Sequence, residues 1–136
     1  MKLKRHLFWI IYSGLVIGVL STHWDPKLFS MNQPMAFGKL LIWLVFVAFS
    51  VFTIHCSMTE KFMKSLRKIV VYKWGQQIGS DLIIGLFLSL FMVYWLTGSA
   101  IAVCLWLIPF IAFGNLATLL FFAINYDSLV SIFLNH

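Results

Sequence analysis

Four long apolar segments dominate this sequence of 136 residues and constrain its fold more than any other feature. They cover residues 7–22, 38–58, 78–96 and 100–124. About 20 apolar residues in a helix are enough to cross the hydrocarbon core of a bilayer. Because every backbone polar group must be paired in lipid, such uninterrupted runs predict helices, not the alternating strands of a barrel. We therefore predict an all-α polytopic membrane protein with four transmembrane helices in an antiparallel bundle.

The composition excludes an ordinary soluble domain. Apolar residues make up 62% of the chain and charged residues 10%, whereas soluble domains have about 45–50% and about 25%. We expect a single membrane domain over residues 1–136. The first apolar run is expected to be a mature helix and not a signal peptide, because no small-residue cleavage motif follows it. The two cysteines, Cys56 and Cys104, are not expected to form a disulfide.

The distribution of lysine and arginine predicts the orientation in the membrane, because cytoplasmic loops carry an excess of both. Lys2, Lys4 and Arg5 precede the first apolar run, and five more basic residues lie between the second and third runs. Only Lys27 and Lys39 remain for the opposite side. We therefore predict an integral protein of a bacterial inner (plasma) membrane with both termini in the cytoplasm.

Residues 59–73 have the pattern of a basic amphipathic helix that lies on the membrane surface, since their apolar residues fall on one arc of a helical wheel. The basic residues of this segment are Lys61, Lys64, Arg67, Lys68 and Lys73. They either recruit anionic lipid or an acidic partner, or only enforce the inside orientation. We favour orientation, because the excess of positive charge inside predicts such a cluster by itself. Ser57 and Glu60 have the spacing of a capping box for this helix.

Three further patterns concern the second half of the chain. Thr97-Gly98-Ser99 predicts a tight turn between the third and fourth helices. Pro109 predicts a kink near Leu105 in the helix over 100–124. Residues 126–135 predict a second interfacial helix, or a segment that packs on a partner, with Asp127 as its cap.

Small residues mark candidate helix-packing surfaces. Gly14 and Gly18 form a G-x-x-x-G motif in the first helix, and Gly85 has the same spacing to Ser89 in the third. Helices associate in lipid through close packing, which small residues permit. The motif in the first helix is either an interface to a partner or second copy, or a packing surface inside its own bundle. We favour the second interpretation, because four helices must pack together.

Polar residues within the apolar runs are the candidate functional residues, because ionisable groups in lipid are costly. Asp81 lies in the third helix one turn after Gln77, and His55 and Asn115 are predicted at a similar depth in the cytoplasmic half. Together these four residues predict a polar intramembrane cluster that can pass a proton or hold an ion or a head group. Alternatively, Asp81 stabilises a helix N-terminus with Lys73 as counter-charge, and His55 reaches water.

No motif in the sequence indicates catalytic residues, a metal site or a cofactor. There is no H-E-x-x-H and no C-x-x-C, and the four acidic residues fall in four separate segments. A two-carboxylate mechanism is therefore not expected. The net charge of +6 is explained by orientation in the membrane, so we expect no nucleic acid as a partner.

Three classes of function remain. The first and favoured one is an accessory or assembly subunit of a larger membrane complex, with membrane lipids and other membrane subunits or further copies of the chain as partners. The second is a small oligomeric transporter or channel that uses Asp81. The third is a membrane-embedded enzyme or lipid-binding protein, which depends on His55 and Asp81. The sequence favours the first class because its helices are apolar and it lacks enzymatic motifs.

Overall fold

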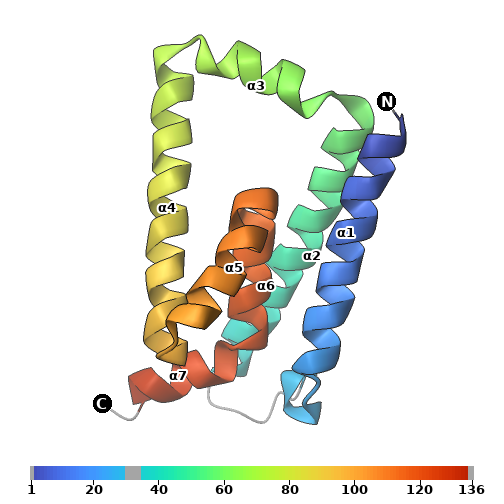
Figure 1. Ribbon diagram of the computed structural model, residues 1–136. Coiled ribbons are helices and arrows are strands. Elements are labelled where there is room, and N and C mark those ends of the chain that lie inside the picture. The colour runs from blue at the N-terminus through green and yellow to red at the C-terminus, as the bar shows by residue number, and fades with distance from the viewer. Residues whose placement is uncertain (1, 30–34, 135–136) are drawn as a thin grey trace. The chain divides into compact units, whose positions relative to one another are not determined.

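The computed structural model describes residues 2–29 and 35–134, and helices account for nearly all of them (Figure 1). In chain order the elements are α1 (Lys2–Thr22), η1 (Pro26–Phe29), α2 (Ala36–Thr59), α3 (Phe62–Val70), α4 (Lys73–Thr97), α5 (Ala100–Phe113), α6 (Asn115–Ile124) and α7 (Tyr126–Leu134). The described ranges contain no strand. The all-α prediction is therefore confirmed.

Two of these helices, α2 and α4, are long and apolar enough to cross a membrane. The pair α6 and α7 also qualifies if it forms one span, although the two helices are bent by 63°. The apolar parts of α1 (His6–Thr22) and α5 are shorter. The structure thus has two to three candidate membrane spans, and the four-span bundle stays a prediction.

The fourth apolar run, 100–124, is not the single helix that the sequence predicted. The chain leaves the helical conformation at Gly114 (φ 55°, ψ −131°), which separates α5 from α6. Glycine reaches this positive φ because it has no Cβ. The Gly114 N–H donates to the carbonyl of Phe110 at 2.8 Å, and its own carbonyl accepts from the N–H groups of Ala117 and Thr118. Helix α5 also continues through Pro109 to Phe113, so the main break lies after the proline.

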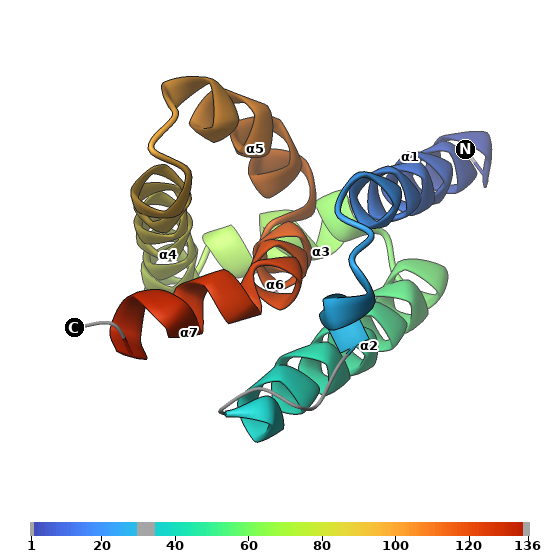
Figure 2. The same cartoon turned by 90° about the horizontal axis from the view of Figure 1, so that it is seen from below.

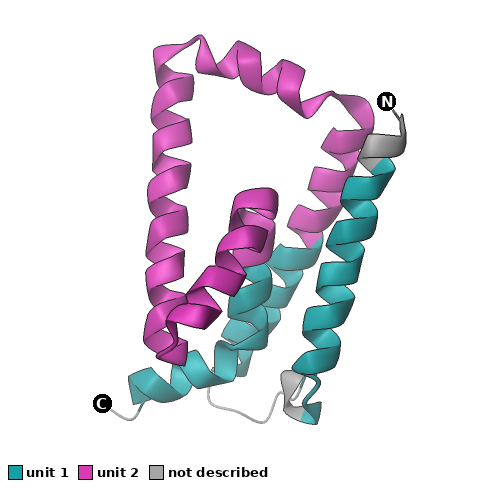
Figure 3. Ribbon diagram, viewed as in Figure 1, with its two compact units in different colours: residues 1–47, 119–136 teal, residues 48–118 magenta. Residues whose placement is uncertain are grey.

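The chain divides into two compact units, residues 1–47 with 119–136 and residues 48–118 (Figure 3). In the second unit α4 packs against α5, and Leu90, Val93 and Phe110 are buried. The turn between them is the predicted one: Gly98 adopts φ 62° and donates its N–H to Tyr94, while the Ser99 side chain accepts from the N–H of Ala102 as an N-cap. The predicted tight turn is confirmed.

The first unit contains α1, η1, the first half of α2, the second half of α6, and α7. An aromatic series connects η1 to α2: the ring centroids of Phe29 and Trp43 lie 5.3 Å apart, and those of Trp43 and Phe46 lie 5.9 Å apart. In Figure 2, α7 is seen lengthwise where α6 is seen nearly end-on. The C-terminal segment therefore turns sharply away from the helix that precedes it.

Candidate functional site

The predicted polar cluster lies on three helices. His55 is near the end of α2, Gln77 and Asp81 are in the first half of α4, and Asn115 begins α6. All four residues are exposed, and within the described ranges no hydrogen bond or ion pair joins any two of these side chains. Their grouping around one polar cavity stays a prediction.

Asp81 differs from the other acidic side chains because it has no partner among the residues that the structure describes. Glu60 and Asp127 each accept a hydrogen bond from another side chain, and Asp25 also interacts. Across residues 2–29 and 35–134, the Asp81 carboxylate makes no hydrogen bond or ion pair, with Lys73 or with any other residue. An exposed, unpaired carboxylate therefore lies within α4, which is one of the candidate spans.

The candidate packing glycines all lie on open helix surfaces. A Cβ atom added to Gly14, Gly18 or Gly85 would meet nothing within 4 Å. A shallow groove also runs along one face of α1, lined by His6, Trp9, Ile10, Ser13, Gly14 and Ile17. Among the described residues, therefore, nothing packs closely on these three glycines.

The basic surface segment forms a shorter helix than predicted. Helix α3 begins after Lys61, whose side chain makes no capping hydrogen bond. The predicted capping box is wrong, because α2 continues through Ser57 to Thr59. Glu60 instead accepts a hydrogen bond from the Ser65 hydroxyl.

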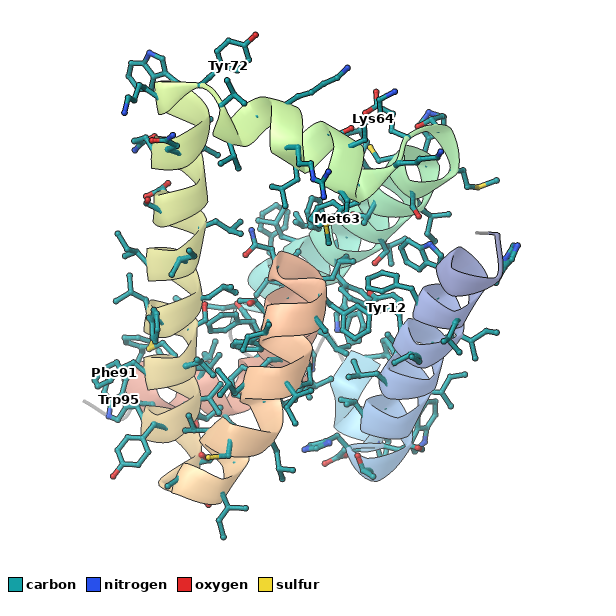
Figure 4. The ribbon with its side chains drawn as sticks, turned by 45° about the horizontal axis from the view of Figure 1, so that its top comes forward. Tyr12, Met63, Lys64, Tyr72, Phe91 and Trp95 are labelled. Atoms are coloured by element: carbon teal, nitrogen blue, oxygen red, sulfur yellow. The ribbon has the colours of Figure 1, made fainter. Side chains whose placement is uncertain are left out.

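The two surfaces of α3 have opposite chemistry. The basic residues Lys61, Lys64, Arg67, Lys68 and, just beyond the helix, Lys73 are all exposed. The apolar residues Phe62, Met63, Leu66, Ile69 and Val70 are also exposed. Figure 4 shows Lys64 and Met63 projecting to different sides of α3. A helix with one cationic and one apolar exposed surface suits the boundary between water and lipid.

A close contact between α3 and α4 holds the two helices crosswise to each other (Figure 1). Gly75 is buried, and a Cβ atom there would collide with the backbone carbonyl of Ile69. The Gln76 side-chain amide donates to the carbonyl of Val70 at 3.0 Å, and the Tyr72 N–H donates to that of Ile69 at 3.0 Å. The amphipathic helix is therefore fixed relative to α4.

One polar site was missed by the sequence reasoning. The Lys39 ammonium lies 2.7 Å from a carboxylate oxygen of Asp127, although the two residues are 88 positions apart. Only 2% of the surface of Lys39 is exposed, whereas the Asp127 side chain is 34% exposed. Asp127 lies in the first turn of α7, where the sequence predicted only a cap. The sequence indicated this pair only by a lysine at the start of the apolar run 38–58 and an aspartate just after the run 100–124.

Two further contacts reinforce this ion pair. The Tyr126 hydroxyl donates to the carbonyl of Met35 at 2.9 Å. Gly38 allows the aromatic ring to approach, since a Cβ atom there would collide with the Tyr126 hydroxyl. The start of α7 is therefore held against the start of α2 by adjacent residues on both helices.

No group of three or more His, Cys, Asp or Glu side chains that could hold a metal ion is found among the described residues. Cys56 and Cys104 are both free and exposed. Comparison with models of protein families, with curated proteins and with solved structures finds no match. The class that the fold supports is thus an all-helical protein with apolar helices suited to a membrane, and function has to be argued from its own residues.

Proposed function

We propose that this protein is an accessory or assembly subunit of a larger membrane complex, in a bacterial inner membrane with the start of α1 and α3 on the cytoplasmic side. The observation that carries the proposal is the exposed Asp81 carboxylate on α4, which has no partner within the described residues. An ionised carboxylate inside a span costs up to about 3 kcal/mol unless it faces a polar group or water. A polar or basic side chain from a neighbouring subunit removes this cost.

The open glycines support the same proposal. Gly14 and Gly18 lie on α1 and Gly85 lies one turn after Asp81 on α4, all without contacts at the position of a Cβ. Small residues let two helix backbones approach closely in lipid. The exposed aromatic residues Phe91 and Trp95 further along α4 point away from α5 (Figure 4), which leaves this surface to lipid or to another subunit.

The proposal is tested by purifying the tagged chain from its own membrane in mild detergent and identifying its companions by native mass spectrometry. The wild type is expected to carry a defined second protein. Asp81→Leu and Gly85→Leu are expected to lose it, whereas Gly79→Leu is the matched control, because it introduces the same side chain at another open glycine of α4. Identical companions in all four samples would contradict the role assigned to Asp81, and a chain without protein companions would overturn the proposal.

A small oligomeric transporter or channel is the second candidate, and the same carboxylate favours it. In this case Asp81 of several copies would line one pathway, because intramembrane carboxylates commonly bind ions or protons. A pure homo-oligomer in the mass spectrum would favour this function. Flux through reconstituted vesicles should then be lost in Asp81→Asn while the oligomer stays intact.

Membrane lipids are the expected partners of α3. Each exposed lysine or arginine near an anionic membrane surface contributes about 1 kcal/mol of attraction, and the exposed apolar surface of α3 can enter the lipid boundary. This contact orients the chain and holds the α3–α4 connection at the inner surface. Native mass spectrometry should therefore detect more bound anionic lipid on the wild type than on the double variant Lys64→Ser/Lys68→Ser.

A further inference from the structure

We infer that α5 and α6 form a re-entrant hairpin that enters the membrane and returns to the same side, and that α7 lies on the outer surface, opposite α3. This differs from the sequence-based prediction of a cytoplasmic C-terminus. The inference depends on the contacts of Lys39 and on the break at Gly114, and it is independent of whether a partner subunit binds Asp81.

The first step is the position of Lys39 in α2. Lys39 and Thr59 lie 20 positions apart in one continuous helix, which corresponds to about 30 Å at 1.5 Å per residue. This length equals the thickness of the hydrocarbon core, about 30 Å. Helix α2 therefore has Lys39 at one membrane surface and α3 at the other. The basic residues of α3 assign it to the cytoplasmic surface, so Lys39 is at the outer one.

The second step is the contact between Lys39 and α7. Asp127 pairs with the Lys39 ammonium at 2.7 Å, and Tyr126 donates a hydrogen bond to Met35, just before α2 begins. Both contacts join the start of α7 to the outer end of α2. A cytoplasmic start of α7 would separate these groups by the thickness of the membrane.

The third step is the path between α4 and α7. Helix α4 follows α3 and is long enough to cross, so its last residue, Thr97, is at the outer surface. The chain between Thr97 and Tyr126 must therefore begin and end on the outer side. The 14 residues of α5 extend only about 21 Å, too short for the hydrocarbon core of about 30 Å. Helix α5 ends at Gly114, where the chain leaves the helical conformation, and we infer that the chain turns back there.

The tip of the hairpin contains backbone groups that lipid cannot pair. Helix ends leave backbone groups without intrahelical partners, and non-helical backbone at membrane depth is tolerated only where protein or water covers it. The tip around Gly114 and the exposed Asn115 is therefore expected to face a water-filled space or protein, not lipid.

The test uses labelling of single cysteines in the full-length chain, in a background with both native cysteines replaced by serine. Trp24→Cys follows α1, Lys64→Cys is on α3, and Ser131→Cys is on α7; all three positions are exposed. A membrane-impermeant maleimide is applied to intact cells and to inverted vesicles, and each variant is also labelled after solubilisation as the reference for full reaction.

We expect Trp24→Cys and Ser131→Cys to react in intact cells and Lys64→Cys to react only in inverted vesicles, with at least a tenfold difference in rate between the two preparations. If Ser131→Cys reacts only in inverted vesicles, as Lys64→Cys does, the inference is overturned. The chain would then cross the membrane once more after α4, either as a straight fourth span or as a bent α6–α7 span. Reaction of Ser131→Cys only after solubilisation would place α7 inside the membrane and would also overturn it. Ser128→Cys, a second exposed position on α7, should repeat the result of Ser131→Cys.

Discussion

The ion pair between Lys39 and Asp127 makes the sharpest prediction about stability. Removing one member of a buried ion pair costs about 3–5 kcal/mol, because the other charge is left buried without its partner. Lys39 is 2% exposed, so Asp127→Ala removes the carboxylate from an almost fully buried ammonium group, which keeps only its other interaction. Since Asp127 itself is one-third exposed, water compensates part of the loss. We expect Asp127→Ala to lower the free energy of unfolding by about 3 kcal/mol, at the lower end of that range.

Replacing the lysine of the pair should lower the free energy of unfolding by less than replacing the aspartate. Lys39→Met retains the length and apolar stem of the side chain, and the carboxylate left behind is the partly hydrated member of the pair. We expect a loss of about 1–2 kcal/mol, as for a polar group that loses its partner. The double variant Lys39→Met/Asp127→Leu removes both charges and should unfold within about 1 kcal/mol of the wild type, because apolar replacement of a buried pair is often neutral.

These free energies are measured by reversible unfolding in mixed micelles, titrated with SDS and followed by tryptophan fluorescence. Asp81→Asn is the charge control, since it removes a carboxylate without a partner in the described chain, and it should not lower the free energy of unfolding. The reasoning is refuted if the double variant is as unstable as the sum of the single variants, because the two charges would then not be coupled.

Four glycines give further predictions, each measured as the melting temperature of the purified protein in detergent. Gly75→Ala should lower the free energy of unfolding by roughly 1–3 kcal/mol, because the added methyl group would meet the backbone carbonyl of Ile69. Gly79→Ala adds a methyl group in open space and should be neutral or stabilising. Equal effects of the two substitutions would contradict the close contact between α3 and α4. Gly38→Ala should cost less than Gly75→Ala, since its methyl group meets the hydroxyl end of a tyrosine that can move aside. Gly114→Ala should cost roughly 1–3 kcal/mol from its positive φ, and an unchanged melting temperature would argue against the break there.

Hydrophobic length was the reliable signal in this sequence. The runs 7–22, 38–58 and 78–96 each lie within one continuous helix of the structure. The position and amphipathic character of α3 were also predictable, because charged and apolar residues alternate there with a helical period. These features are local, so they can be read from neighbouring residues.

The features that the sequence reasoning missed depend on tertiary context. Glycines 79 and 85 continue α4 without a break, whereas Gly114 ends α5 with a positive φ. The residue type is the same, and only the surrounding chain decides between the two outcomes. The pairing of Lys39 with Asp127 likewise joins positions 88 apart, and nothing in either neighbourhood specifies the other. The prediction that both termini are cytoplasmic also depends on how many apolar runs cross the membrane, and local hydropathy does not determine that number.

The four acidic side chains differ in whether a group of the same chain interacts with them. Asp127 is paired with Lys39, Glu60 accepts a hydrogen bond, and Asp25 has an interaction of its own. Asp81 alone has none among the described residues, and it is also the carboxylate inside a candidate span, where an unpaired charge costs most. Binding of another molecule at Asp81 would remove the free-energy cost of an unpaired charge within the membrane. This contrast makes α4 the surface on which a partner or a second copy should first be sought.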